Sequence, residues 1–122
     1  MSETWIDRST GVLDRLEGTD PPPKDEQRAA VKESLAVLVE RAPGRSVEVR
    51  VPPFAAVQVI EGTTHRRGTP PAVVEMDAIT WLALALGRLD WAAAVSTGRV
   101  RASGARSDLS ALLPIVPPPD LT

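Results

Sequence analysis

The sequence predicts an α+β, or mixed α/β, fold. Segments with strand periodicity follow one another between residues 46 and 76, and most segments with helical periodicity lie before or after them. Such a grouping of strands and helices is typical of α+β domains. The length of 122 residues is enough for one domain with one core, and the 43% of apolar and 25% of charged residues are close to the averages of globular proteins.

Residues 1–23 are expected to form a helical segment and a linker. Trp5, Val12 and Leu16 approximate one face of a helix over residues 3–16, and Gly11 interrupts this marginal helix. The following GTDPPP cannot continue it, because consecutive prolines lack N–H donors and favour extended backbone. We therefore expect the main domain to cover residues 24–116, with a loosely held proline-rich tail at 117–122.

Residues 25–42 have the pattern of an amphipathic helix. Val31, Leu35 and Leu38 follow at spacings of four and three, while charged residues cover the other directions. The proline and glycine at 43 and 44 end this helix.

Three strands are predicted after this helix. Valines alternate with charged residues over 46–51, which indicates a half-buried strand. Two prolines interrupt it, and the β-branched run over 54–60 forms with it either a bent strand or a strand pair. Beyond a polar loop over 63–71, paired valines within 72–76 predict the third strand.

Two short capped helices and a fourth strand follow. Asp77 precedes a helix over 78–86 and Asp90 precedes one over 91–97, and each carboxylate can accept unpaired N–H groups of the first helical turn. A glycine follows each helix as its expected stop. Residues 99–103 alternate as a strand.

A final helix is predicted near the C-terminus. Ser107 is placed to cap it, it carries Leu109, Leu112 and Leu113, and it ends at Pro114.

The composition excludes several classes of function. The chain has no cysteine, so it forms no disulfide, zinc–thiolate site, iron–sulfur cluster or thiol nucleophile. His65 is the only histidine, so one chain cannot supply a histidine-rich metal site, and no glycine-rich phosphate-binding spacing occurs. We therefore expect no catalysis, no metal and no cofactor.

The composition also limits which partners and which cellular compartment we expect. The net charge of −2 and the scarcity of aromatic residues argue against nucleic-acid binding. No apolar stretch approaches the roughly 20 residues of a membrane-spanning helix, and the start MSETWIDRST lacks the features of a signal peptide. We expect a cytoplasmic protein with no nucleic-acid partner and no membrane insertion.

One long stretch of the chain is similar to a known family. Residues 74–115, VEMDAITWLALALGRLDWAAAVSTGRVRASGARSDLSALLPI, resemble the second half of sterol carrier protein domains. They share its order of strand, capped helix with an aromatic residue, L-A-x-G-x-L, second short helix, G-x-hydrophobic-x-x-x-G and leucine-rich closing segment. The upstream APGRSVEVRVPPFAAVQVIEG and RGTPPAVVE are similar to the compact bacterial branch, so the resemblance covers roughly residues 25–116.

The resemblance implies a curved, mainly antiparallel sheet of four to five strands, with helices packed on one face and an apolar cavity between them. In larger members that cavity holds sterols, fatty acids or acyl chains. We therefore expect a non-catalytic binding or carrier domain for a small apolar or amphipathic, lipid-like ligand. The candidate cavity residues are Trp81, Leu82, Leu86, Leu89, Trp91, Val95 and Leu112.

The alternative is a structural or protein-interaction domain whose core these side chains fill, and which contacts another protein or a second copy of the chain. We do not expect an empty apolar cavity, because an unfilled void of ligand size costs too much free energy. A ligand pocket of about 300 Å³, at roughly 24 cal/mol per Å³ of void, would cost around 7 kcal/mol. That is a large part of the total stability of about 5–15 kcal/mol.

The loop over 63–71 contains a cationic cluster. His65, Arg66 and Arg67 are candidates for contact with an anion or a partner. The alternative is an ordinary solvated surface loop.

Overall fold

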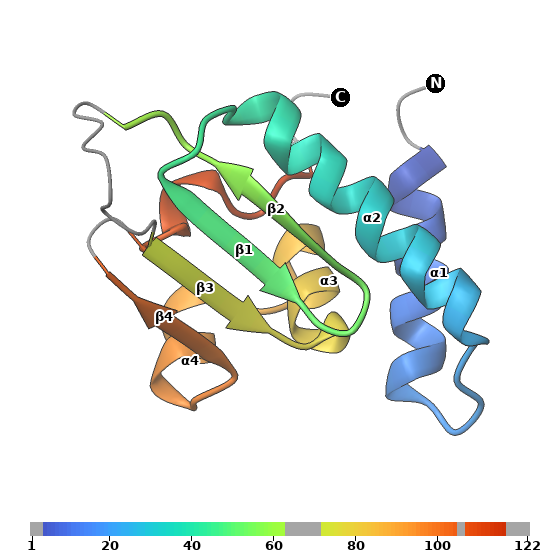
Figure 1. Ribbon diagram of the computed structural model, residues 1–122. Coiled ribbons are helices and arrows are strands. Elements are labelled where there is room, and N and C mark those ends of the chain that lie inside the picture. The colour runs from blue at the N-terminus through green and yellow to red at the C-terminus, as the bar shows by residue number, and fades with distance from the viewer. Residues whose placement is uncertain (1–3, 63–71, 105–106, 117–122) are drawn as a thin grey trace.

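The protein is an open four-stranded mixed sheet with helices on one side of it (Figure 1). The computed structural model describes residues 4–62, 72–104 and 107–116. In chain order the elements are α1 (Thr4–Glu17), α2 (Lys24–Arg41), β1 (Val47–Val51), β2 (Ala55–Val59), β3 (Ala72–Met76), α3 (Ala78–Leu86), α4 (Trp91–Ser96), β4 (Val100–Ser103) and the 3-10 turn η1 (Ser110–Leu112). The predicted α+β class is confirmed.

The strands lie in the order β2-β1-β3-β4. β1 pairs antiparallel with β2 and β3 pairs antiparallel with β4, whereas the central pair β1 and β3 is parallel. The sheet is therefore mainly antiparallel, as expected. Of the two predictions for residues 46–60, the strand pair is the one the structure forms, with Val49 opposite Val57.

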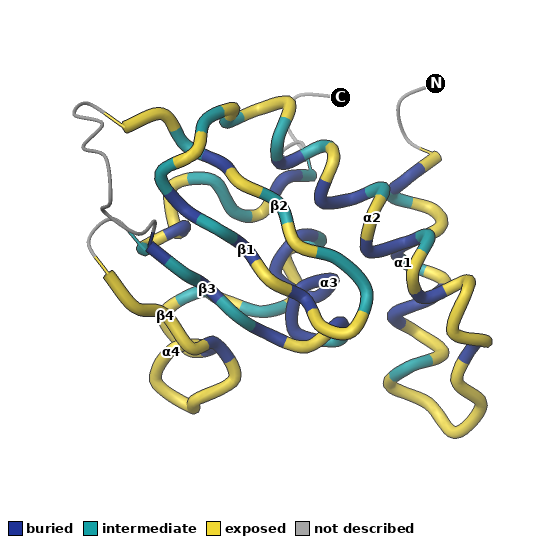
Figure 2. Tube along the Cα trace, in the orientation of Figure 1, coloured by how far each residue is buried: buried dark blue, intermediate teal, exposed yellow. Residues whose placement is uncertain are grey.

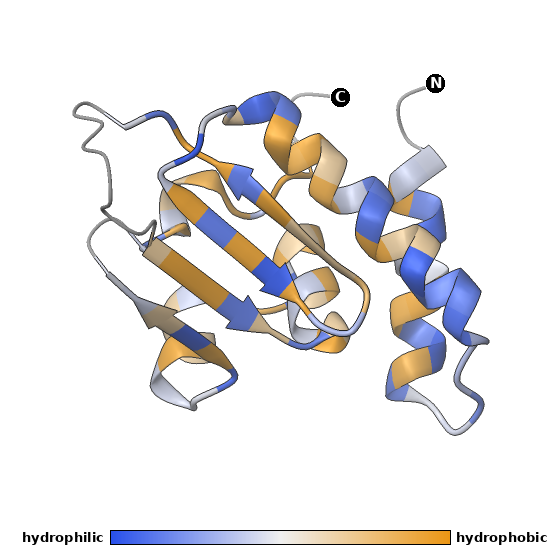
Figure 3. Cartoon of the chain, in the orientation of Figure 1, coloured by the Kyte–Doolittle hydropathy of each residue, from blue (hydrophilic) through white to orange (hydrophobic). Residues whose placement is uncertain are grey.

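The two faces of the sheet differ in character. Every second residue of β1 and β3 is buried, and the residues between them are half-buried or exposed (Figure 2). Figure 3 shows the same alternation as hydrophobic and hydrophilic bands along β1, whereas β3 is hydrophobic except for one hydrophilic band. The buried set faces the helices and consists of Val47, Val49, Val51, Ala72, Val74 and Met76. Period-two alternation of this kind gives one packed and one solvated face.

Helix α1 runs unbroken through Gly11, so the prediction that this glycine interrupts it is wrong. Gly11 is exposed, and a Cβ built there would meet nothing within 4 Å. An exposed glycine within a helix costs about 1 kcal/mol. The burial of Trp5, Val12 and Leu13, where α1 packs against α2 and α3, outweighs this cost.

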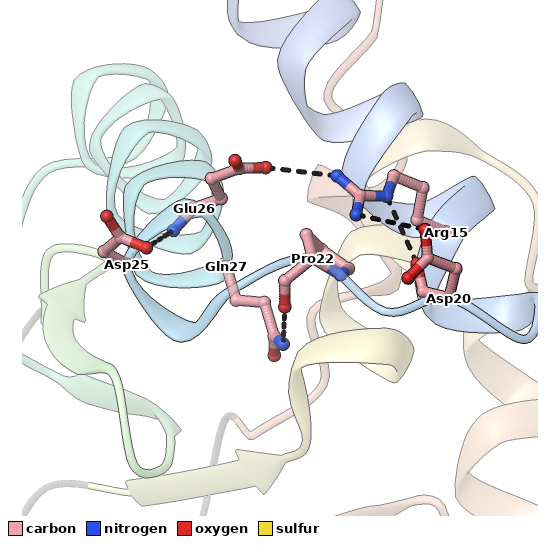
Figure 4. A network of polar contacts seen from close by, with 6 residues as sticks. All are labelled: Arg15, Asp20, Pro22, Asp25, Glu26 and Gln27. Carbon is pink, nitrogen blue, oxygen red and sulfur yellow. Dashed lines mark hydrogen bonds and ion pairs between the residues drawn. The ribbon is translucent and has the colours of Figure 1, made fainter.

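The residues between α1 and α2 form a hydrogen-bonded connection (Figure 4). Arg15 Nε donates to the carbonyl of Asp20 at 3.2 Å, and its guanidinium lies 3.4 Å from Oε2 of Glu26. The buried Nε2 of Gln27 donates to the carbonyl of Pro22 at 2.8 Å. These contacts hold α1 and α2 together as a helical hairpin.

Helix α3 is the centre of the core. Its predicted cap is confirmed, since Asp77 Oδ1 accepts the N–H of Thr80 at 2.9 Å. Trp81 is fully buried, and its Nε1 donates to Ser34 Oγ of α2 at 2.8 Å. Ser34 Oγ in turn donates to the carbonyl of Ala30 at 2.7 Å. A polar link therefore fixes α3 to α2 inside an otherwise apolar layer.

The predicted C-terminal helix is wrong, because only the 3-10 turn η1 forms there. Ser107 does not cap it: its Oγ donates backward to the carbonyl of Gly104 at 3.1 Å. Leu109 and Ile115 are both fully buried, and the extended backbone of Leu113 spans the distance between them. A proline at 114 disfavours helical backbone at the residue before it, which explains the extended conformation.

Candidate functional site

The turn between α3 and α4 faces the C-terminal segment across a surface hollow of about 440 Å³. We call it the α3–α4 hollow. It is lined by Gly87, Arg88, Leu89, Asp90, Trp91, Ala92, Asp108, Ser110, Leu113 and Pro114. One wall is therefore the turn between two capped helices, and the other is the segment that follows β4.

Two backbone features set the distance between these walls. Gly87 ends α3 in the left-handed conformation (φ 80°), and a Cβ at this position would lie 3.3 Å from Cβ of Pro114. The N–H of Ile115 donates to the carbonyl of Ala85 at 3.0 Å. This bond pairs one of the last carbonyls of α3, which have no partner within the helix.

The α3–α4 hollow is lined in part by large apolar side chains, those of Leu89, Trp91 and Leu113, which we call its floor. Each of the three is only partly buried while packing against the buried core. The core therefore reaches the surface here, and an aromatic ring is part of the exposed area.

The lining also includes the charged side chains of Arg88, Asp90 and Asp108, which we call its rim. Asp90 Oδ2 caps α4 by accepting the N–H of Ala93 at 3.2 Å, as predicted. Asp108 Oδ1 accepts the N–H of Ser110 at 2.9 Å. This backbone hydrogen bond, with a further one from the Ser110 side chain, holds the pKa of the Asp108 carboxyl below its ordinary value. Asp108 is therefore ionised at neutral pH.

The cation at the rim is already paired. Arg88 Nη1 donates to Oδ1 of Asp14 at 2.6 Å and lies 3.9 Å from Oε1 of Glu17, both in α1. The positive charge of Arg88 is therefore neutralised by carboxylates of α1, which do not line the hollow. The hollow combines an apolar floor with an acidic rim, which suits a molecule that has an apolar part and a polar end.

The structure divides the predicted cavity residues among different places. Leu89 and Trp91 line the α3–α4 hollow. Trp81 and Leu82 are fully buried in the core between the sheet and the helices. The remaining three do not line the hollow: Leu86 and Leu112 are half-buried, and Val95 is 41% exposed on α4.

Several lining residues were not singled out from the sequence. Ser110, Leu113 and Pro114 fall in the predicted closing helix and at its end, and Asp108 was given no role. The useful signal was the proline after Leu113, since a residue before proline is biased toward extended backbone. The cationic cluster His65, Arg66 and Arg67 lies outside the described residues.

A second hollow, of about 400 Å³, lies at the end of the sheet near Pro52. It contains charges of both signs: Arg101 pairs with Glu75 at 3.2 Å, and Arg99 Nε donates to Oγ1 of Thr80 at 3.3 Å. Its mixed lining gives no preference for one class of ligand.

Among the described ranges, 4–62, 72–104 and 107–116, no three histidine, cysteine, aspartate or glutamate side chains gather in a way that could hold a metal ion. In the same part of the chain, no helix combines the length and apolar character needed to cross a membrane.

Comparison with known proteins identifies the family. Residues 23–115 match the family model described as bacterial SCP ortholog. A search of curated proteins finds no match. The matched region begins one residue before α2 and ends at Ile115, so it contains the whole sheet and both walls of the α3–α4 hollow. Because this match covers well over half of the chain, the protein belongs to the sterol carrier protein family, whose domains are generally non-catalytic carriers.

Proposed function

We propose that this chain is a non-catalytic binding or carrier domain for a small lipid-like molecule, held with its apolar part in the α3–α4 hollow. The observation that carries the proposal is the floor of the hollow, where Leu89, Trp91 and Leu113 join the core and yet remain partly exposed. Membership of a carrier family supports the same function.

The size and energetics of the hollow agree with this role. Its volume of about 440 Å³ falls within the range of about 300–1,000 Å³ that is usual for ligand sites. A tryptophan offers about 150–250 Å² of surface. Trp91 is only partly exposed, so a ligand can cover about a third of this surface at most, and at roughly 25 cal/mol per Å² this would contribute about 1–2 kcal/mol to binding.

The rim restricts the head group of the ligand. Asp90 and Asp108 place two carboxylates beside the apolar floor, and Asp108 stays ionised. A ligand whose polar end donates hydrogen bonds, such as an alcohol, can pair with them. A fatty-acid carboxylate would be repelled. We therefore place neutral amphipathic molecules ahead of fatty acids.

A second candidate function is a structural or protein-interaction domain with a filled core. It is favoured by one observation, the complete burial of Trp81 and Leu82 between the sheet and the helices. Under this alternative the hollow is a surface feature with no small-molecule ligand.

Two experiments separate these functions. Native mass spectrometry of the protein purified without detergent, followed by lipid extraction, is expected to show a bound lipid-like molecule. Calorimetric titration with 1-decanol and with decanoate, which have chains of equal length, is expected to give saturable binding of the alcohol and weaker binding of the acid.

Variants on one helix provide the control. Trp91→Ala should weaken decanol binding by tenfold or more, whereas Val95→Ala, at an exposed position of α4 outside the hollow lining, should leave it unchanged. Absence of saturable binding together with absence of a co-purifying molecule would support the filled-core alternative. Equal effects of the two substitutions on decanol binding would show that the binding site is not the α3–α4 hollow.

A further inference from the structure

Arg88 is the basic residue of the α3–α4 hollow. Among the described residues, no other lysine, arginine or histidine contributes to its lining, whereas Asp90 and Asp108 contribute two carboxylates. An anionic headgroup in the hollow therefore has the Arg88 guanidinium as its one source of side-chain positive charge within this described lining. Where the guanidinium points decides which class of amphiphile the hollow can hold.

The backbone of Arg88 is fixed by the end of α3. The N–H of Arg88 donates to the carbonyl of Ala83 at 2.8 Å, and the N–H of Gly87 donates to the carbonyl of Leu84 at 3.2 Å. Such a pair of bonds is the usual way in which a helix ends at a left-handed glycine. The position of the Arg88 backbone is therefore set by α3 itself, and the long side chain is the part that can choose its partner.

Helix α1 determines the partner of that side chain. Arg88 Nη1 donates to Oδ1 of Asp14 at 2.6 Å and lies 3.9 Å from Oε1 of Glu17. The two acidic residues are three apart in α1 and are therefore neighbours on its surface. Buried Trp5 and Leu13 hold α1 against the core, so both carboxylates stay beside Arg88.

We propose that Asp14 and Glu17 set the ligand preference of the α3–α4 hollow by holding the Arg88 guanidinium on α1, away from the ligand. This inference rests on the proposed carrier function. While Arg88 is held there, a ligand headgroup meets the carboxylates of Asp90 and Asp108, and neutral amphiphiles are preferred. If both α1 carboxylates are neutralised, the guanidinium turns to the charges of the hollow. It then pairs with an anionic headgroup or offsets the rim carboxylates, and either arrangement admits a fatty-acid-like ligand.

The two partners of this interaction lie in different parts of the chain. The family match over residues 23–115 includes Arg88 and the whole hollow, whereas Asp14 and Glu17 precede it. The preference for neutral ligands is thus set by a segment that the family model does not cover. The alternative is a surface ion pair that only helps to hold α1, and such a pair would not change the choice between an alcohol and an acid.

The test is calorimetric titration of the intact chain with 1-decanol and with decanoate at low salt. Asp14→Asn/Glu17→Gln removes both partners of Arg88 at side chains that are 58% and 49% exposed, so folding should change little. We expect decanoate to bind about fivefold more tightly than to the wild type, with decanol binding unchanged.

A matched control removes the same charge from other places. Asp7→Asn/Glu40→Gln changes two exposed acidic residues that form no ion pair among the described residues. This variant should keep the wild-type ratio of decanoate to decanol affinity. A gain in decanoate binding equal to that of Asp14→Asn/Glu17→Gln would show that only the net charge matters, and would overturn the proposal.

A third substitution separates pairing with Arg88 from a simple loss of repulsion. Adding Arg88→Gln to the Asp14→Asn/Glu17→Gln variant should abolish the gain in decanoate binding, whereas adding Arg88→Lys keeps the positive charge and should retain most of it. In NMR spectra, the Nε–H signal of Arg88 should shift on addition of decanoate to the Asp14→Asn/Glu17→Gln variant, and should shift less in the wild type.

The outcomes distinguish this inference from the proposed function. Decanol binding to all variants with an unchanged ratio of decanoate to decanol affinity would overturn the role of Asp14 and Glu17 and leave the carrier function standing. A decanoate gain that persists after Arg88→Gln would do the same. Absence of decanol binding to the wild type would overturn the carrier function and this inference with it.

Discussion

Replacing Ser34 with alanine tests the hydrogen bond that joins α2 to α3. Ser34 Oγ accepts from Nε1 of Trp81 at 2.8 Å, and both residues are 0% exposed. Alanine leaves the indole N–H buried without a partner, which costs about 1–3 kcal/mol. The better helix propensity of alanine returns about 0.5 kcal/mol. We expect the free energy of unfolding to fall by about 1–2 kcal/mol.

The same substitution at Ser9 is the matched control and should act in the opposite direction. Ser9 is also helical and 0% exposed, but among the described residues its Oγ has no hydrogen-bond partner. Removing a buried hydroxyl that has lost its water without gaining a partner should raise the free energy of unfolding by about 1 kcal/mol. The melting temperatures of the two variants should move apart, by roughly 4 °C for each kcal/mol.

Urea unfolding of a double-mutant cycle measures the interaction directly. Trp81→Phe removes the N–H donor, so Ser34→Ala should cost about 1 kcal/mol less in that background than in the wild type. An equal cost in both backgrounds would refute the assigned hydrogen bond. A loss of stability in Ser9→Ala would show that its hydroxyl has a partner after all.

Three further predictions concern Gly87, Asp77 and Asp108. Gly87→Ala should lower stability by about 1–2 kcal/mol in urea unfolding, because its φ of 80° is unfavourable for residues with a Cβ; Gly11→Ala, in an open helical position, should raise it by about 0.5–1 kcal/mol. Loss of stability in both would contradict this. Asp77→Ala should lower the melting temperature by removing an N-cap worth about 1 kcal/mol, and an unchanged melting temperature would argue against the cap. NMR titration should place the pKa of Asp108 below that of aspartate in the unfolded chain, with most of the shift retained in Ser110→Ala because the backbone N–H contributes most. The stabilisation from this carboxylate is then present above the unfolded pKa and lost as the pH falls through the folded one. An ordinary Asp108 pKa would refute the assignment.

The parts of the fold that depend on neighbouring residues could be predicted from the sequence. The caps at Asp77 and Asp90 and the stop at Gly87 follow from local hydrogen bonding, and all three are confirmed. The parallel pairing of β1 with β3 joins segments separated by β2 and by residues 60–71, so no local pattern indicates it. Gly11 was misjudged for a related reason, because packing on α2 and α3 stabilises α1 beyond its own propensity.

The candidate site was only partly visible in the sequence. Leu89 and Trp91 were among the apolar cavity residues that the family resemblance implied. The residues of the opposite wall, Leu113 and Pro114, could not be singled out. They reach the hollow through an extended segment, whereas the leucine spacing indicated a helix. That segment is positioned by the distant carbonyl of Ala85, and periodicity carries no information about such a partner.

The hydrogen bond from Ile115 to Ala85 also affects how the chain is completed during synthesis. The N-terminal part of a protein leaves the ribosome first, so α3 emerges before Ile115 can donate to the carbonyl of Ala85 and before Leu109 and Ile115 can pack into the core. Until the final turn arrives, the nascent protein exposes an apolar strip that chaperones can bind. A stop codon just before Leu109 would make that exposure permanent and direct the product toward proteolysis.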